Sequence, residues 1–303
     1  MTDEARIAIH HLSGLRISEK LRLRNLSVTE LLQLDRIECE SLIGRRIRGR
    51  FEPDEAVRQA GVDLENLTVG RFGYTFYWES GYPSLLREIH DPPFLLYHRG
   101  NPPDWGSSSV AVVGTRYPTG YSRDRAYELG GEFAHLGIPV VSGLAVGRDE
   151  AVHRGVVKGG GIAIAVLGNG IDSVYPAANR GLARQIVETG GTIVSEYGSS
   201  VPPRRYHFPA RNRIIASCCR STVLVESPAR SDALITADFA LDEGRDLFVH
   251  RAGVTGPNRG GTAQLAEDGA RIVEHANDVA SEWADVDSIE YPETKVEVDG
   301  QKA

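Results

Sequence analysis

The sequence predicts an α/β protein with a mostly parallel, doubly wound sheet and a small all-helical module in front of it. Two observations predict this fold class. From about Tyr82 onward, short runs of apolar residues alternate with segments of helical pattern. These runs lack the polar alternation of a half-exposed strand, so they fit the strands of a parallel sheet that is buried on both faces.

The expected elements follow in order along the chain. Residues 1–75 carry apolar positions at helical spacing in LSVTELLQLD and IECESLIGRRI, which predicts short helices with Ser27 and Ser41 as N-caps. Residues 76–275 hold the sheet. Its strand candidates are residues 109–115, 138–143, 162–168, 192–197, 222–227 and 246–250, and its helix candidates are residues 121–136, 151–159, 179–190, 211–219 and 232–244. Residues 276–303 predict one short helix followed by a flexible end.

Composition limits the class of protein. A chain of 303 residues that is 41% hydrophobic and 25% charged is globular in composition. Its three cysteines include the neighbours Cys218 and Cys219 and match no metal-ligand spacing, so we expect no metal site. The charged N-terminus does not resemble a signal peptide, and no apolar run is long enough to span a membrane. We therefore expect a cytoplasmic protein without a membrane-spanning helix.

The charge is distributed unevenly. The net charge of −7 argues against a histone-like binder of nucleic acid. Most of the excess acid lies in residues 276–303, which carry 8 acidic and 2 basic side chains. The rest of the chain is nearly balanced, so a local cationic surface for nucleic acid is still compatible with the composition.

Ligands of a doubly wound sheet bind beyond the carboxyl ends of its strands, and Gly114, Gly143 and Gly168 lie at the ends of three strand candidates. In VAVVGTRYPTG the strand leads into a helix, where backbone N–H groups and the helix dipole favour a phosphate. Neither a P-loop lysine nor a G-x-G-x-x-G motif follows, so we expect no nucleotide hydrolysis and no cofactor. Arg116 either donates two hydrogen bonds to a phosphate or is a solvated arginine on a tight turn.

A second cationic feature lies directly before a predicted core helix and consists of Arg211, Asn212 and Arg213. Because Pro209 ends the preceding loop, these residues are predicted in the first helical turn, where cations oppose the helix dipole unless an anion binds. This mismatch favours recognition of a phosphate or a carboxylate. The basic and aromatic residues upstream suit a nucleic-acid backbone with stacked bases, and they are Arg204, Arg205, Tyr206, His207 and Phe208.

Three carboxylates leave alternatives open. Glu196 and Glu226, at the ends of TIVSEY and TVLVES, are either an acid/base pair or the groups that neutralise the arginines described above. Asp149 and His153 lie one helical turn apart in SGLAVGRDEAVHRG, and they either brace a helix or take part in catalysis. No serine or cysteine nucleophile has a recognisable partner in this segment.

Six motifs follow the segment YPSLLREIHDPPFLLYHRG, in the order VAVVGTR, VVSGLAVGRDEAVH, AVLGNGIDSVYPAANRGL, TIVSEY, FPARNRIIA and LITA. Together they resemble the DNA processing protein A (DprA/Smf) family of bacterial DNA uptake and recombination, and the similarity covers about residues 82–270. The resemblance implies an extended Rossmann-like fold that binds and protects single-stranded DNA and helps to load a RecA-type recombinase. It also implies a homodimer without a catalytic step.

The resemblance further implies which residues form a phosphate-binding surface. These residues are Gly114, Thr115, Arg116, Ser142, Gly143, Gly168, Arg211, Asn212 and Arg213. Residues 1–75 would correspond to a SAM-like or helix-hairpin-helix-like module that can touch nucleic acid. Its most cationic run is either a DNA contact or a solvated helix end, and it contains Arg45, Arg46, Arg48 and Arg50.

The sequence departs from the family pattern at several positions. Arg148 stands where the family has isoleucine in Gly-Ile-Asp, and Asp232 interrupts a Ser-Gly-Ser motif. Asp232 places a negative charge near the expected anion site, which would weaken DNA binding or change the ligand. The winged-helix module of some family members is expected to be absent, since residues 276–303 are too few to form one.

Two other functions stay open. One is a nucleotide-binding enzyme or sensor of the Rossmann-like phosphoribohydrolase type, in which Glu196, Glu226 and Asp149 would act as acid/base groups. The Pro-Gly-Gly loop of those enzymes is missing here, which speaks against it. The other is a degenerate homologue that binds partners through its helices or its acidic tail.

Overall fold

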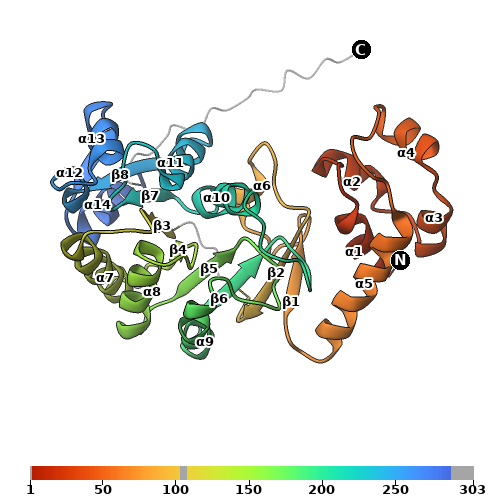
Figure 1. The fold of residues 1–303 in the computed structure, drawn as a ribbon, viewed down its shortest axis with the longest axis horizontal. Helices are drawn as coiled ribbons and strands as arrows, with labels where there is room; N and C mark the ends of the chain where they lie inside the picture. Colours follow the sequence, from red (N-terminus) through yellow and green to blue (C-terminus); the bar gives the residue numbers. More distant parts are fainter. Residues whose placement is uncertain (1, 103–107, 288–303) are drawn as a thin grey trace, which may run out of the picture.

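The computed structural model describes residues 2–102 and 108–287 (Figure 1). Within these residues a single sheet contains nine strands. The strands are β1 (Gly73–Phe76), β2 (Leu95–Gly100), β3 (Val110–Val113), β4 (Val140–Ser142), β5 (Ala163–Leu167), β6 (Thr192–Ser195), β7 (Ser221–Leu224), β8 (Asp246–His250) and β9 (Arg271–Val273).

The strand order in the sheet is β1-β2-β6-β5-β4-β3-β7-β8-β9. Strands β3 to β9 pair with one another in parallel, whereas β1 and β2 are antiparallel to their neighbours. The chain builds outward from β3 to β6 and then returns to β7 on the other side of β3. This reversal is the doubly wound arrangement, so the predicted fold class is confirmed.

The helices fall into two groups. Those of the N-terminal region are α1 (Asp3–His11), α2 (Ile17–Leu23), α3 (Val28–Gln33), α4 (Arg36–Ile43) and α5 (Pro53–Thr68). Those around the sheet are α6 (Ser84–Arg87), α7 (Gly120–His135), α8 (Arg148–Lys158), the short 3-10 helix Ala177–Asn179, α9 (Arg180–Glu188), α10 (His207–Ser217), α11 (Asp232–Asp242), α12 (Arg251–Val254), α13 (Gly260–Glu267) and α14 (Ala276–Asp287).

The predicted elements correspond closely to these. The six strand candidates are β3 to β8, and the five helix candidates are α7 to α11. Strands β1, β2 and β9 were not predicted, because β1 and β9 are short edge strands and β2 ends in polar residues. Helix α14 matches the helix expected at the start of residues 276–303, and the flexible end expected after it lies outside the described residues. None of the described helices is long and apolar enough to cross a membrane.

Both faces of the sheet are covered. Alternate residues of β3 belong to two separate apolar clusters, with Val110 and Val112 in one and Ala111 and Val113 in the other. The first cluster contains the inner sides of α7, α8 and α9, and the second contains those of α6, α10 and α11. Strand β3 is fully apolar because its side chains point into a core on both sides.

Helices α7 and α8 lie in backbone contact, because glycines face each other across their interface. A Cβ atom at Gly130 would overlap the carbonyl group of Val152, and one at Gly155 would overlap the carbonyl group of Tyr127. Larger residues at either glycine would therefore force the helices apart. The close approach fixes the relative position of the two helices that follow β3 and β4.

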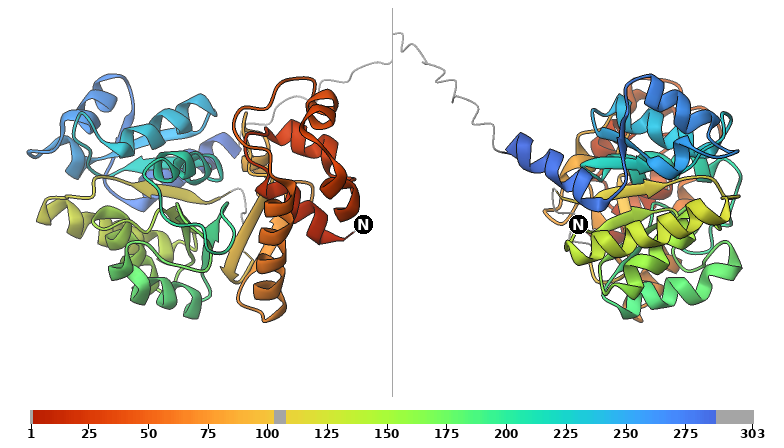
Figure 2. Two further views of the ribbon diagram at one scale, coloured as in Figure 1. Left: turned by 45° about the vertical axis from the view of Figure 1, so that its right-hand side comes forward. Right: turned by 90° about the vertical axis from the view of Figure 1, so that its left-hand side faces the viewer.

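Residues 3–68 lie at the β1 end of the sheet (Figure 2). Ser27 caps α3, as predicted: its side chain accepts from the Glu30 N–H, and its own N–H donates to Glu30. Ser41 lies inside α4 instead, where Asp35 is the N-cap, so that prediction was wrong. Strand β1 begins at Gly73, just before the boundary expected at residue 76.

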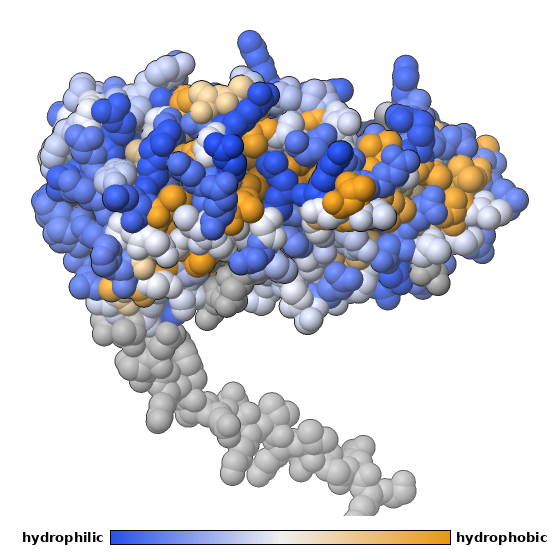
Figure 3. Space-filling view, turned by 90° about the horizontal axis from the view of Figure 1, so that it is seen from below, coloured by the Kyte–Doolittle hydropathy of each residue, from blue (hydrophilic) through white to orange (hydrophobic). Residues whose placement is uncertain are grey.

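Seen from below, the molecule shows small apolar groups between hydrophilic residues (Figure 3).

A buried carboxylate joins the N-terminal helices to the sheet. Asp63 of α5 accepts hydrogen bonds from the Tyr97 hydroxyl of β2 (2.6 Å), from His11 Nε2 (2.8 Å) and from the Ser199 N–H (2.7 Å). Gln59 Nε2 also donates to the Ser199 carbonyl (2.8 Å), and His10 Nε2 donates to the Glu196 carbonyl (2.9 Å). The helices of residues 3–68 thus hold β2 and the segment between β6 and α10.

Replacing Asp63 by asparagine is expected to destabilise the protein by about 1–2 kcal/mol at neutral pH, because an amide cannot accept all three bonds. Burial raises the pKa of Asp63, but the bonds from His11 and Tyr97 outweigh it and leave the pKa below its usual value. A lowered carboxyl pKa contributes stability above the unfolded value of about 3.9, and this stability is lost as pH falls through the folded value. Urea unfolding should therefore separate the two proteins at pH 7 and much less in strong acid.

The matched control for this prediction is Asp54→Asn, which removes an exposed carboxylate from the first turn of the same helix. Its unfolding should differ little from that of the parent protein. Equal stability of the Asp63→Asn variant and the parent protein at pH 7 would contradict the anchoring role of Asp63.

Candidate functional site

A cleft of about 260 Å³ opens at the carboxyl edge of the sheet, where β3 and β7 lie side by side and lead to opposite faces. Five of the predicted site residues line it: Gly114, Thr115, Arg116, Arg211 and Asn212. The other four, Ser142, Gly143, Gly168 and Arg213, are not part of its lining. Phe208 and Asp232 also line the cleft. The sequence analysis placed Phe208 in the basic and aromatic segment before α10, and it identified Asp232 as a departure from the family motif.

Arg116 and Arg230 are the exposed arginines of this cleft lining, and Arg116 lies at the end of β3. The Arg116 side chain is 46% exposed, and Nη2 donates to Asp232 Oδ2 at 3.0 Å. The Asp232 carboxylate is itself 58% exposed, and the Arg116 guanidinium lies 5.9 Å from the centre of the Phe208 ring. An ion pair this exposed contributes about 0–1 kcal/mol, so a phosphate can compete with Asp232 for the guanidinium.

Helix α10 begins at His207, four residues earlier than predicted, and this corrects the helix-dipole argument. Arg211, Asn212 and Arg213 lie in the second turn of α10 rather than the first, where the dipole exerts little effect. The prediction placed the start of α10 too late, because Pro209 was interpreted as the end of a loop. It is instead part of the first helical turn, a position that tolerates proline.

Arg211 is buried and ties strand ends together. It donates to the Gly143 carbonyl at 2.6 Å and also to the Val166 carbonyl, so it links the ends of β4 and β5. A Cβ atom at Gly143 would overlap its guanidinium group, which explains the glycine. Burial lowers the pKa of Arg211 to about 10, although Asp149 opposes this shift. Most of its donors are occupied within the protein.

Arg213 points toward Glu196 and away from the cleft lining. It donates to the two carboxylate oxygens of Glu196 at 2.7 and 2.9 Å and to the Asp91 carbonyl at 3.0 Å. These bonds leave little of its charge available to a ligand. Of the two alternatives for Glu196, the structure shows the ion pair, and the arginine that it neutralises is Arg213.

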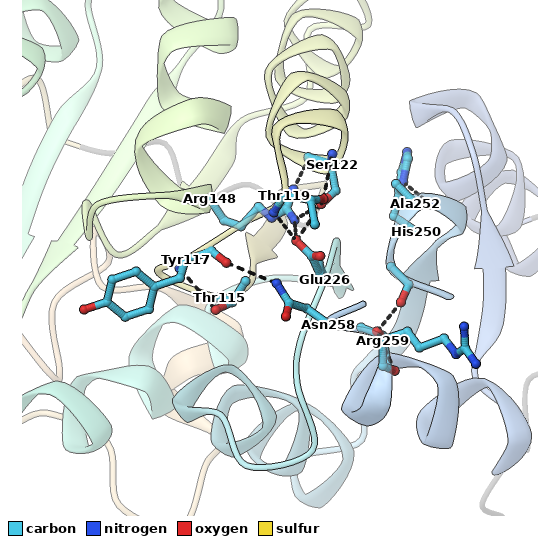
Figure 4. Close-up of polar contacts among 12 residues, drawn as sticks. Thr115, Tyr117, Thr119, Ser122, Arg148, Glu226, His250, Ala252, Asn258 and Arg259 are labelled. Atoms are coloured by element: carbon cyan, nitrogen blue, oxygen red, sulfur yellow. Dashed lines mark hydrogen bonds and ion pairs between the residues drawn. The ribbon is translucent and has the colours of Figure 1, made fainter. Parts of the chain in front are cut away.

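Glu226 has a different partner, which is also an arginine. Its carboxylate accepts from Arg148, from the Thr119 N–H (3.1 Å) and from the Ser122 hydroxyl (2.5 Å), and Arg148 also donates to the Ser122 carbonyl (Figure 4). The Arg148 and Glu226 side chains are both buried. Glu226 thus occupies the place at the start of α7 where the sequence predicted a phosphate. A buried carboxylate with three donors is not a free general base.

Asp149 braces the loop after β4, and His153 is buried beside it in α8. Asp149 accepts from the backbone N–H groups of Gly143 (3.2 Å) and Ala145 (3.3 Å). Burial lowers the pKa of His153 to about 3, so this imidazole is neutral at physiological pH. Leu144, between the two N–H groups, adopts a left-handed conformation with φ of 58°, which marks local strain beside the cleft.

Ser142 and Gly168 support the cleft from behind. The Ser142 hydroxyl donates to the Val112 carbonyl at 2.7 Å, within the sheet. A Cβ atom at Gly168 would lie 2.9 Å from Phe208 Cδ1, so the glycine allows Phe208 to reach the cleft. Gly114 is similar, since a Cβ atom there would lie 2.7 Å from Arg148 Cγ. These small residues shape the site without offering a side chain to a ligand.

The sequence did not single out Tyr117 or Arg230, although both line the cleft. The only signal for Tyr117 was its place directly after Arg116 in GTRYPTG. Among the described residues, no group of three or more His, Cys, Asp and Glu side chains is arranged to hold a metal ion.

Comparisons with known proteins agree with this architecture. A family model described as DNA recombination-mediator protein A matches residues 73–284. The DNA processing protein DprA of Streptococcus pneumoniae is 39% identical over 204 residues, which cover 67% of this chain and 71% of that protein. Protein Smf of Borreliella burgdorferi is 30% identical over 275 residues, which cover 89% of this chain and 85% of that protein.

Two solved structures share the fold. The X-ray structure of DprA from Streptococcus pneumoniae has a TM-score of 0.72 and 30% identity, and the match covers 96% of this chain and 99% of that one. A structure of DNA processing protein A from Helicobacter pylori, described for its single-stranded DNA binding mode, has a TM-score of 0.63 and 26% identity over 71% of this chain and 97% of that one. With the family model and the curated relatives in agreement over most of its length, the chain belongs to the family of DNA recombination-mediator protein A.

Proposed function

We propose that this protein is a non-catalytic accessory factor that binds single-stranded DNA at the cleft between β3 and β7. The observation that carries the proposal is Arg116, a half-exposed guanidinium at the mouth of the cleft whose ionic partner is an exposed carboxylate. Arginine forks suit phosphate oxygens, and the adjacent Phe208 ring offers a face to a base. The resemblance of the chain to a DNA processing protein with a described single-stranded DNA binding mode supports this ligand.

The other predicted site residues take supporting roles in this proposal. Arg211 and Asn212 line the cleft, and Gly114, Thr115, Ser142, Gly143 and Gly168 set its shape. Arg213 lies outside the lining and would act through the position of α10. Within the family role, the protein would work in the cytoplasm as a homodimer, protect the strand and pass it to a RecA-type recombinase. Residues 1–75, 76–275 and 276–303 would serve as helical module, DNA-binding domain and tail.

The competing function, a phosphoribohydrolase-like enzyme or nucleotide sensor, loses support from the same geometry. Of its three candidate acid/base groups, Glu226 and Asp149 are buried and already accept hydrogen bonds. The third, Glu196, is paired with Arg213. The N–H group of Thr119 near the start of α7 is bonded to Glu226, so it is not available to a nucleotide phosphate. No described observation favours turnover of a small nucleotide.

The test is a titration of the protein with labelled oligo-dT and with nucleoside monophosphates over a range of salt concentrations. We expect oligonucleotide binding that weakens as salt rises, because phosphate contacts release counterions. We expect no release of free base from any monophosphate. Salt-insensitive binding, or release of base, would overturn the proposal.

Replacing Arg116 by alanine is expected to weaken oligo-dT binding about fivefold and to reduce the salt slope by about 0.7, the value for one single-strand phosphate contact. Fluorescence anisotropy at several salt concentrations measures both quantities. The matched control is Arg184→Ala, which removes an exposed arginine of α9 that does not line the cleft. An equal loss in both variants would show a general charge effect and no specific contact at Arg116.

A further inference from the structure

A groove of about 600 Å³ runs between the N-terminal halves of α7 and α8 and adjoins the cleft described above. Arg116 and Tyr117 line both hollows, so the groove continues the cleft across the loop that follows β3. Its remaining lining includes Arg123, Tyr127, Glu150 and Arg154. A ligand held by Arg116 therefore has a direct path into this groove.

The groove presents two aromatic rings to solvent. Tyr117 is 83% exposed and Tyr127 is 41% exposed. The backbone of Tyr117 is fixed from both sides: its N–H donates to Thr115 Oγ1 (3.2 Å), and its carbonyl accepts from Asn258 Nδ2 (3.3 Å). Its ring points away from both partners (Figure 4). An exposed tyrosine on a fixed backbone offers a flat apolar surface, and little further conformational entropy is lost when a ligand binds to it.

The charges around these rings suit a polyanion. Arg116, Arg123 and Arg154 outnumber the two carboxylates of the lining, Asp124 and Glu150. Arg154 pairs with Glu150 at 2.9 Å and Arg123 lies 3.9 Å from Asp124, and all four side chains are at least partly exposed. Such pairs exchange easily for phosphate contacts.

The groove is also rigid, which favours a built binding surface. Helices α7 and α8 touch through Gly130 and Gly155, where a Cβ atom would overlap the facing backbone. One of the facing carbonyl groups belongs to Tyr127 itself. The two helices that border the groove, one of which carries Tyr127, therefore cannot shift independently, and a strand would find this part of the groove already in place.

We propose that the groove between α7 and α8 is a base-stacking subsite for single-stranded nucleic acid, in which bases stack on Tyr117 and Tyr127. The arginines of the groove contact the phosphates between these bases. This inference rests on the proposed function and extends its site from the cleft to a second surface. Stacking on aromatic faces tolerates any base, so the subsite adds affinity without adding sequence preference.

The experiment compares Tyr117→Ala and Tyr127→Ala with the parent protein on two probes of equal length, labelled oligo-dT and an oligomer of abasic deoxyribose phosphates. Each variant is expected to bind oligo-dT about tenfold more weakly, the loss typical of one stacked base. Binding of the abasic oligomer should not change. Tyr117→Phe keeps the aromatic face and should bind like the parent protein.

Tyr121→Ala is the matched control, because Tyr121 is also exposed on α7 but lies outside the groove lining. Like the groove tyrosines it lies near an arginine, with the Arg125 guanidinium 5.6 Å from the centre of its ring. This control should leave both affinities unchanged, and thermal unfolding checks that all variants are folded. Equal oligo-dT affinity in the tyrosine variants and the parent protein would overturn the subsite, as would an equal loss on the abasic oligomer. Failure of the parent protein to bind oligo-dT would instead overturn the proposed function itself.

Discussion

Replacing Glu226 by alanine is expected to lower the free energy of unfolding by about 3–5 kcal/mol. The change leaves the buried Arg148 guanidinium without its counterion, and the Thr119 N–H and Ser122 hydroxyl lose their acceptor. The reverse change, Arg148→Met, should cost less, because Glu226 keeps those two donors while an apolar chain of similar length fills the space. Urea unfolding measures both free energies.

A double variant tests whether the pair acts as a unit. The variant that combines Glu226→Ala with Arg148→Met should lose less free energy of unfolding than the two single variants lose together, because no unpaired charge remains buried. Additive losses would show that the two side chains do not depend on each other.

Replacing Asp232 by lysine is expected to strengthen oligo-dT binding by more than about tenfold and to steepen its dependence on salt. The change frees the Arg116 guanidinium from its carboxylate partner and adds a cation to the cleft lining. Asp232→Asn removes only the competing charge, so its gain should be smaller. Anisotropy titrations over a salt series measure the gain.

Asp238→Lys provides the control, because Asp238 is an exposed residue of the same helix that does not line the cleft. It changes the net charge equally and should alter binding far less. A similar gain in both lysine variants would mean that Asp232 acts only through overall charge. No gain in Asp232→Lys would mean that the carboxylate does not limit access to Arg116.

Much of the fold was predictable because its signals are local. Strands β3 to β8 are short apolar runs buried on both faces, and α7 to α11 fill the intervals between them. Strands β1 and β9 escaped because edge strands of three or four residues contain too few apolar positions. The start of α10 was misplaced because a proline in a first helical turn resembles a loop end in sequence.

The candidate site was predictable only in outline. The glycines and arginines after the strands indicated the correct edge of the sheet, since parallel strands end together. Whether an arginine stays accessible depends on partners that are distant in the sequence. Arg213 pairs with Glu196, and Arg148 pairs with Glu226, which lies 78 positions further along the chain. Such pairs form only when the chain has folded, so one sequence could not distinguish the exposed Arg116 from the buried Arg211.

The anchoring of residues 3–68 has a consequence for how the cleft is assembled. Asp63 and Gln59 bind Ser199, and His10 binds the Glu196 carbonyl, so three side chains of these helices hold the segment that leads into α10. Helix α10 carries Phe208 and Arg211, which line the cleft. The N-terminal helices therefore act as a remote brace for one wall of the proposed DNA site. A fragment that starts at residue 76 would lose this brace together with most of β1. DNA affinities measured on such a fragment would therefore not represent the cleft of the intact chain.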